Sequence, residues 1–209
     1  ALCGVLGAGV FLHFDAAGDW STLVVAQAVG VFFFLWLLVI LAGIDWDTFI
    51  LPDTLTLGGV VVFGVFAWGT KFSSLTEIGL GAGAGFLSFF TVSILYRVVR
   101  GREGLGLGDA KLLALIGAVL GPLALLPLVL LAAVQGLLVA LIFLVFRVRR
   151  DPPVPFVGIS EADPEFDELF RSPPGSWMLT PMPFGPFLSL AALEVFFTRP
   201  LWQPILFGI

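Results

Sequence analysis

An apolar stretch from Val29 to Ile44, VGVFFFLWLLVILAGI, constrains the fold of this chain more than any other feature. A helix that crosses a bilayer needs about 20 predominantly apolar residues, whereas barrel strands alternate apolar and polar residues. Of the 209 residues, 59% are hydrophobic and only 12% are charged, against about a quarter charged in soluble domains. These features predict an all-α integral membrane protein, a polytopic helical bundle.

Apolar segments recur along the chain and predict about six to seven transmembrane or partly spanning helices. Together they form a single membrane-embedded domain over residues 1–209. The expected helices cover residues 2–12, 22–44, 54–68, 77–99, 109–120, 122–146 and 183–198. Residues 45–52 and 101–108 are expected to be loops. A polar loop is expected at about 147–182, where five acids fall between Glu161 and Glu168.

Basic residues are divided unequally between the two faces of the membrane if the spans alternate. One face has Arg97, Arg100, Arg102, Lys111, Arg147, Arg149, Arg150 and Arg171, and the other has Lys71 and Arg199. Lys and Arg are enriched in cytoplasmic loops, so the richer face, which also holds Asp45 and Asp109, is predicted to be cytoplasmic. No basic face for nucleic acid is present, and the bilayer is the expected surrounding.

Four aspartates near this face are candidates for function. Asp53 precedes an apolar run and is most simply a helix N-cap, and Asp47 is most simply a solvated loop residue. Asp109 is read equally well as a cap or as a functional acid. Asp45 ends a long apolar helix at the membrane boundary, and carboxylates at such a depth are functional candidates by default.

The residue types available limit the chemistry. The single histidine, His13, is expected on the opposite face, and Cys3 is the single cysteine. A serine or cysteine nucleophile would lack its base, and zinc would lack its ligands, so no metal site is predicted. Two close carboxylates need neither, because one stays protonated while the other is ionised. Glycines beside Asp109 would let an extended peptide come close.

Three motifs resemble those of the type IV prepilin peptidases, which are membrane aspartic proteases with a Gly-x-Gly-Asp motif. In the stretch IDWDTFILPDTLTL, an aspartate stands eight residues before the acid of a Pro-Asp pair, and this corresponds to Asp45, Pro52 and Asp53. The stretch GREGLGLGDAKLLALIGA resembles the second motif and corresponds to Glu103, Gly106, Gly108, Asp109 and Lys111. The stretch PMPFGPFLSLAAL resembles the late motif, at Pro183, Phe184, Gly185 and Pro186.

The resemblance implies that Asp45 and Asp109 are the catalytic pair and that the other motif residues bind substrate or support the site. Such enzymes cut the basic leader from prepilins and type II secretion pseudopilins, at the cytoplasmic face of the bacterial inner membrane. No cofactor is implied for the peptidase. Many members also methylate the new N-terminus with S-adenosylmethionine. Zinc belongs to an N-terminal cytoplasmic domain of the family, which is expected to be absent from this chain.

Two alternative functions remain. The first is another Gly-x-Gly-Asp protease that resembles signal peptide peptidase or presenilin, but those have Tyr-Asp and Pro-Ala-Leu motifs. Here Ile44 precedes Asp45, and a Pro-Phe-Gly-Pro segment stands in the late position. The second is a proton-coupled transporter that uses the acids as a relay. Transporters often show repeated halves, and the sequence shows no internal repeat.

Overall fold

The computed structural model describes residues 2–15, 21–100, 106–146 and 182–207, and within these ranges the chain is helical without strands. The elements are α1 (Leu2–Asp15), α2 (Thr22–Thr48), α3 (Asp53–Gly69), α4 (Leu75–Arg100), α5 (Leu107–Leu120), the short 3-10 helix η1 (Pro122–Ala124), α6 (Leu125–Phe146) and α8 (Gly185–Phe207). The prediction of an all-α helical bundle is confirmed. The polar segment predicted at 147–182 lies, except for Met182, outside the described residues.

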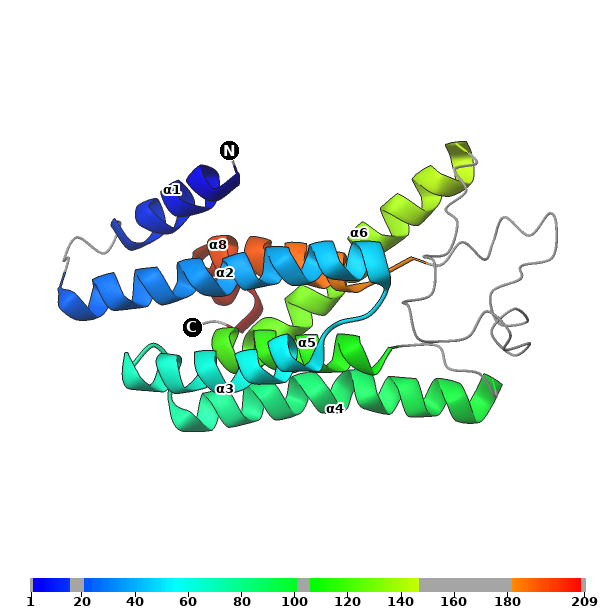
Figure 1. Cartoon of the computed structure of the whole chain (residues 1–209), viewed down its shortest axis with the longest axis horizontal. Helices are drawn as coiled ribbons and strands as arrows, with labels where there is room; N and C mark the ends of the chain where they lie inside the picture. The colour runs from blue at the N-terminus through cyan, green and yellow to red at the C-terminus, as the bar shows by residue number, and fades with distance from the viewer. Residues whose placement is uncertain (1, 16–20, 101–105, 147–181, 208–209) are drawn as a thin grey trace.

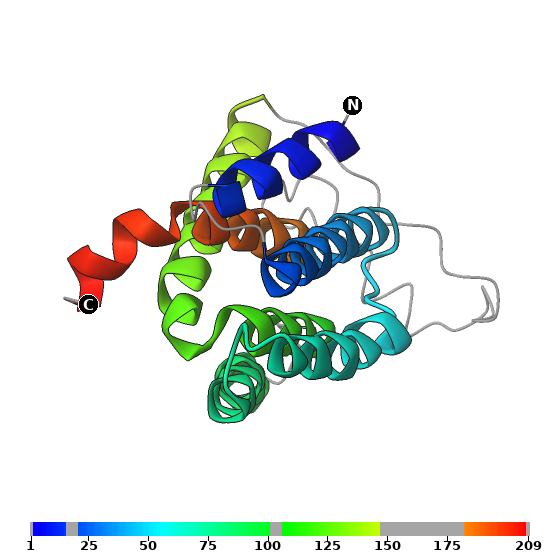
Figure 2. The ribbon, with the colours of Figure 1, turned by 90° about the vertical axis from the view of Figure 1, so that its left-hand side faces the viewer.

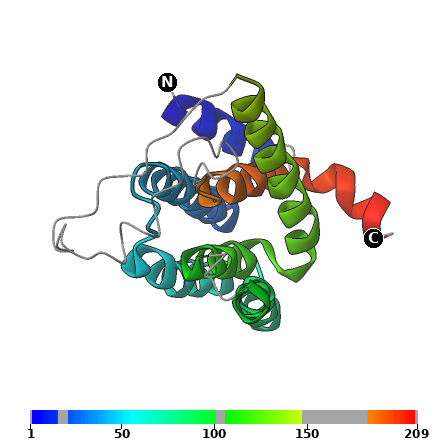
Figure 3. The ribbon, with the colours of Figure 1, turned by 90° about the vertical axis from the view of Figure 1, so that its right-hand side faces the viewer.

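The helices form two layers joined by α6. Seen nearly end-on, α2 and α8 lie side by side in one layer, and α3, α5 and α4 lie in the other (Figure 2). From the opposite end, α6 runs along one side of both layers (Figure 3). α5 is central, because it packs against α3, α4 and α8, and α1 lies on α2 (Figure 1).

Three helices in the described part of the chain are long and apolar enough to cross a membrane. They cover Thr22–Thr48, Leu75–Leu95 and Pro122–Phe146, and the shorter apolar helices are Leu2–Asp15 and Asp53–Gly69. Many of their large apolar side chains face outward, as in α6, where Leu137 is 69% exposed. An outer surface of this composition suits hydrocarbon, so the protein is a helical membrane protein.

Two of the long helices begin with side-chain caps that their sequences encode. Ser21 accepts a hydrogen bond from the backbone N–H of Val24 at the start of α2. At the start of α4, Ser74 and Glu77 form a reciprocal capping box. The Glu77 carboxylate accepts from the Ser74 N–H at 2.8 Å, and the Ser74 hydroxyl accepts from the Glu77 N–H at 3.2 Å. These bonds satisfy backbone donors that a helix start leaves unpaired.

The end of α2 corrects one prediction. Residues 45–52 were expected to form a loop, but α2 continues to Thr48, and the chain turns at Phe49. Phe49 adopts a left-handed conformation with φ of 56°, and its N–H donates to the Asp45 carbonyl at 3.0 Å. The extra turn is helical because this bond and its neighbours continue the helical pattern past the apolar run. Asp45 is therefore fixed within a helix.

The core of the bundle is α5, which is buried along nearly its whole length from Ala110 to Leu120. It contacts α4 through glycines. A Cβ on Gly81 would overlap the carbonyl oxygen of Gly117, and a Cβ on Gly117 would overlap that of Gly81. One turn further along α4, a Cβ on Gly85 would overlap the carbonyl of Leu113. Small residues thus let two helix backbones touch, as in other membrane bundles.

The C-terminal helix also differs from its prediction. It was expected to end near residue 198, but α8 runs from Gly185 to Phe207. Its first half is buried against α2 and α6, with Leu188, Ala191 and Ala192 fully covered. Helical hydrogen bonding continues through Pro200 and Pro204, although proline removes one backbone donor at each position.

Candidate active site

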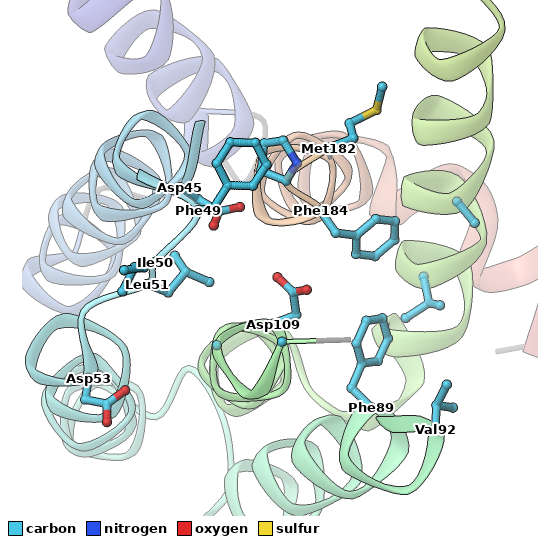
Figure 4. Close-up of a pocket in the computed structure, with 15 residues that line it drawn as sticks. Asp45, Phe49, Ile50, Leu51, Asp53, Phe89, Val92, Asp109, Met182 and Phe184 are labelled. Carbon is cyan, nitrogen blue, oxygen red and sulfur yellow. The ribbon is translucent and has the colours of Figure 1, made fainter. Parts of the chain in front are cut away.

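One cavity of about 860 Å³ opens at the end of the bundle where α2 ends and α5 begins. Its described lining comes from seven places along the chain: the end of α2, the link to α3, the start of α3, α4, the start of α5, α6 and the segment before α8. The lining residues are Asp45, Phe49, Ile50, Leu51, Asp53, Phe89, Val92, Gly106, Gly108, Asp109, Val129, Ala133, Met182, Pro183 and Phe184. Both Asp45 and Asp109 point their carboxyl groups into this cavity (Figure 4).

Asp45 lies in the last turn of α2 and is only 4% exposed. Its Oδ2 accepts a hydrogen bond from the backbone N–H of Gly185 at 2.9 Å. Gly185 is the first residue of α8, so its N–H has no partner within its own helix. The start of one helix thereby holds the acid at the end of another.

Asp109 lies in the first turn of α5, outside the three helices long enough to cross a membrane. Helix α5 begins at Leu107 and its N-cap position is Gly106, so Asp109 is not the capping residue of this helix. Burial raises the pKa of the Asp109 carboxyl, and the charge of Asp45 raises it further, to about 7. The charge of Asp45 therefore disfavours the ionised form of Asp109, as expected when two carboxyls share one site.

The glycines before Asp109 differ from each other in their surroundings. Gly106 and Gly108 both line the cavity. A Cβ on Gly106 would have no atom closer than 3.8 Å, whereas a Cβ on Gly108 would stand 3.2 Å from the Cβ of buried Leu51. Gly108 therefore lets the link between α2 and α3 approach the start of α5.

Asp53 and Lys111 form a second polar contact beside the cavity. The capping role predicted for Asp53 is wrong, because Pro52 occupies the N-cap position of α3 and Asp53 is its first helical residue. The Asp53 carboxylate instead accepts from Lys111 Nζ at 2.5 Å. This ion pair links α3 to α5, with the Asp53 side chain 62% exposed and that of Lys111 21% exposed. It connects the end of the first motif in α3 to the second motif in α5.

The late motif closes the opposite side of the cavity. Pro183 and Phe184 line it, and the Phe184 ring stacks on Phe89 of α4 with centroids 5.8 Å apart. The Phe184 carbonyl accepts from the backbone N–H of Phe187 at 3.1 Å, which starts α8. Pro186 is part of α8 and is not among the lining residues.

Several lining residues were not anticipated from the sequence. Phe49, Ile50 and Leu51 follow Asp45 directly, and Phe89 belongs to a helix with no motif. An apolar residue in an apolar chain carries no sign of its role. Leu51 alone has a local signal, because it is an apolar residue directly before the proline of a short link.

The remaining predictions near the site concern Glu103, metal binding and Asp47. Glu103, expected to support the second motif, lies outside them. Within the described ranges, no group of three His, Cys, Asp or Glu side chains gathers as it would around a metal ion. Asp47 is exposed in the last turn of α2, away from the cavity lining.

The fold and the cavity define a class: a helical membrane protein with two acidic side chains from distant helices in one cavity. Residues 31–141, more than half of the chain, match the type IV leader peptidase family. This chain belongs to the type IV leader peptidase family, which confirms the resemblance inferred from the three motifs.

Curated relatives agree with the family. A protein of Burkholderia pseudomallei called "Prepilin leader peptidase/N-methyltransferase" is 35% identical over 95% of this chain and 53% of its own length. Proteins of the same name from Pseudomonas putida and Pectobacterium carotovorum are 35% and 43% identical, over 83% and 54% of this chain and 48% and 41% of their own lengths. The chain thus spans about half the length of these relatives. No solved structure matches it.

Proposed function

We propose that this chain is a membrane-embedded aspartic endopeptidase that cuts the leader from type IV prepilins or type II secretion pseudopilins. One observation carries the proposal: Asp45 and Asp109, 64 residues apart in sequence, line one cavity and point their carboxyls into it. Membership in the leader peptidase family and the names of the relatives support the choice of substrate. Those names also include an N-methyltransferase, and our proposal for these residues is limited to the peptidase.

The chemistry needs one ionised and one protonated carboxyl. The ionised member takes a proton from water as the water oxygen bonds to the scissile carbonyl carbon, and the protonated member donates to the carbonyl oxygen. The pKa of Asp109, raised to about 7 by burial and by Asp45, allows a single proton on the pair near neutral pH. Positioned acid–base groups of this kind typically contribute about 10²–10⁴-fold each to the rate.

The cavity suits a peptide at the border of a hydrophobic helix. On the side of α4 and α6 it is lined by Phe89, Val92, Val129 and Ala133, which offer an apolar wall. At the other side lie the two carboxyls and the ion pair of Asp53 with Lys111. A leader junction, polar on one side of the scissile bond and apolar on the other, matches this division.

The inner membrane, with the cavity at its cytoplasmic face, is the proposed location. Helix α4 ends at Arg100 and α5 starts at Leu107, so Arg97, Arg100 and Lys111 belong to the end of the bundle where α5 begins, which is also the cavity end. Lys71 lies in the turn at the opposite end, between α3 and α4. This asymmetry supports the orientation through the enrichment of Lys and Arg on the cytoplasmic side.

The decisive experiment is cleavage of a prepilin by the purified full chain in detergent. We expect Asp45→Asn and Asp109→Asn each to slow cleavage by about 10²–10⁴-fold or more, roughly 3–5 kcal/mol of transition-state stabilisation. The double variant should lose little beyond either single one, because half a pair is already inactive. Full activity in Asp109→Asn would refute the aspartic protease mechanism.

Matched controls come from the other two acids of the first motif. Asp47→Asn removes an exposed charge from the same helix turn as Asp45 and should leave the rate within about twofold. Asp53→Asn breaks only the partly exposed pair with Lys111 and should keep most activity. Loss in Asp47→Asn with full activity in Asp45→Asn would show that the wrong acid has been assigned. Thermal unfolding of each variant checks that the fold is intact.

A further inference from the structure

The two carboxyls in the cavity differ in their hydrogen bonding. Asp45 Oδ2 accepts from the Gly185 N–H at 2.9 Å. No residue in the described part of the chain donates a hydrogen bond to the Asp109 carboxyl, although that group lines the same cavity. A donor to a carboxylate stabilises its ionised form. The site is therefore asymmetric before any substrate binds.

The donor belongs to the first turn of a long helix. Gly185 begins α8, whose backbone dipole adds partial positive charge at this end. The carbonyl of Phe184 starts the helical hydrogen bonding, and the N–H of Gly185 is left to point outward at Asp45. An anion next to such a helix start is favoured by the donor and by the dipole together.

Glycine alone fits this position. A Cβ on Gly185 would stand 2.5 Å from Asp45 Oδ2 and 3.0 Å from its Cγ. Either the carboxyl or the helix start would have to move, and the hydrogen bond at 2.9 Å would be lost. The requirement for glycine in the late motif thus has a specific physical cause at the catalytic pair.

We propose that Gly185 is a positioning residue that holds Asp45 as the ionised, water-activating member of the pair and so leaves Asp109 as the member that carries the proton. Burial disfavours the ionised form of the Asp109 carboxyl, and within the described ranges a backbone N–H donates to Asp45 and none donates to Asp109. The elevated pKa of Asp109, about 7 through burial and through the charge of Asp45, agrees with this division. The catalytic part of this inference rests on the proposed peptidase function.

The roles give a balanced reaction. Asp45 takes a proton from water while the water oxygen bonds to the carbonyl carbon, and Asp109 gives its proton to the carbonyl oxygen, which forms a neutral gem-diol. Asp45 then passes its proton to the departing nitrogen as the C–N bond breaks. Asp109 recovers a proton from the diol, and both acids return to their starting states.

Other charges near the cavity do not alter the assignment. Asp53 lines the cavity from α3 but is paired with Lys111 of α5. The described lining residues of α4, α6 and the segment before α8 are all uncharged. The ionisation of Asp109 therefore depends mainly on burial and on Asp45, and the neighbour that distinguishes Asp45 is the Gly185 N–H.

A first test detects the protonated carboxyl group by infrared spectroscopy and does not depend on cleavage activity. Infrared difference spectra of the purified chain at pH 6 should contain a protonated-carboxyl C=O band, which Asp109→Asn removes and Asp45→Asn keeps. Asp47→Asn, which alters an exposed acid in the same turn as Asp45, should leave the band in place. A band lost in Asp45→Asn and kept in Asp109→Asn would overturn the assignment.

A second test displaces the Gly185 N–H that donates to Asp45. Gly185→Ala should shift the acidic limb of the pH–rate profile upward by about 1–2 pH units, since a hydrogen bond to a charged group is lost. The alkaline limb, set by Asp109, should stay in place. The matched control is Gly43→Ala, in the same helix as Asp45, where a Cβ would meet no atom within 4 Å and both limbs should be unchanged.

The outcomes separate the two proposals. A shift of the alkaline limb in Gly185→Ala would mean that Asp45 carries the proton, and a uniform rate loss with both limbs fixed would mean that Gly185 is only structural. Each result refutes the positioning role. If the chain cuts no prepilin, the peptidase proposal fails, while the infrared spectra still decide which acid carries the proton.

Discussion

Glycines bring backbones together at two places in this protein, and the two contacts have different consequences. Between α4 and α5, Gly81 and Gly117 let each backbone touch the carbonyl of the other, deep in the bundle. At the start of α8, Gly185 lets a backbone N–H reach the Asp45 carboxylate beside a cavity of about 860 Å³. The first contact allows α4 and α5 to pack closely, and the second positions the Asp45 carboxylate at the cavity.

The comparison shows that the effect of a glycine depends on what it approaches. A carbonyl in a helix has its own hydrogen-bond partner, so the contact at Gly117 contributes dispersion and close packing. A carboxylate can change its charge, so the contact at Gly185 controls a proton. Substitutions should therefore alter stability at the first contact and the pH dependence of catalysis at the second.

The largest effect is expected from Gly117→Val, which should break the packing contact alone. Its side chain would overlap the Gly81 carbonyl, and backbone cannot yield as a side chain can. Unfolding in detergent should become easier by about 3 kcal/mol or more, beyond the usual cost of overpacking. The cleavage rate per folded molecule and its pH profile should remain those of the parent.

The control for this variant lies on the neighbouring helix. Gly83→Val adds the same side chain within the glycine-rich run of α4, where a Cβ would meet no atom within 4 Å. Its melting temperature should stay close to that of the parent. Equal destabilisation by both variants would mean that the added side-chain bulk itself, and not the contact between α4 and α5, sets the cost.

The next largest effect is expected in the pH dependence of the cleavage rate. In the proposed mechanism Asp109 must be protonated to donate to the carbonyl, and its pKa is raised to about 7 by burial and by the charge of Asp45. Cleavage should therefore fall by about tenfold per pH unit above 7. Initial rates between pH 5 and 9, corrected for the folded fraction, would measure this limb. A rate that keeps rising to pH 9 would contradict the role of Asp109.

A smaller effect should separate the two glycines before Asp109. Gly108→Ala requires Leu51 to move by a few tenths of an ångström, so we expect a loss of about 1 kcal/mol in stability or a severalfold lower rate. Gly106→Ala meets no atom closer than 3.8 Å and should behave like the parent. The opposite ranking would show that Gly106 gives room to the substrate while Leu51 adapts freely.

The smallest effect is expected at the ion pair beside the cavity. Lys111→Met keeps the apolar stem and removes the charge that pairs with Asp53, whose side chain is 62% exposed. Exposed pairs contribute about 0–1 kcal/mol, so stability should change by less than about 1 kcal/mol and cleavage by less than about fivefold. A complete loss of activity would indicate that Lys111 acts on substrate.

Much of the fold was predictable because hydrophobic length decides it. The runs around Val29–Ile44 and in α6 could only be membrane helices. The extent of α2 was not predictable, because Asp45 and Asp47 are poor membrane residues and the hydrogen bond that extends the helix is made by Phe49. The composition predicted that this helix ends before Asp45, but backbone hydrogen bonds extend it to Thr48.

The candidate acids were predictable from their types and positions, but their surroundings were not. Nothing local indicates that Gly185 donates to Asp45, because the two residues are 140 positions apart. Asp53 had the sequence of a helix cap, yet Lys111 from another helix pairs with it. Partners of this kind are brought together by the packing of whole helices, and a short motif contains no information about that packing.

The turn at Phe49 places backbone strain next to the cavity. A non-glycine residue at a φ of 56° is disfavoured by roughly 1–2 kcal/mol, and glycine or asparagine would relieve this. Phe49 nevertheless places its aromatic ring against the cavity, one turn after Asp45 (Figure 4). Directed evolution for heat resistance alone would favour replacing it, and lineages selected in that way should drift away from their ability to process substrate.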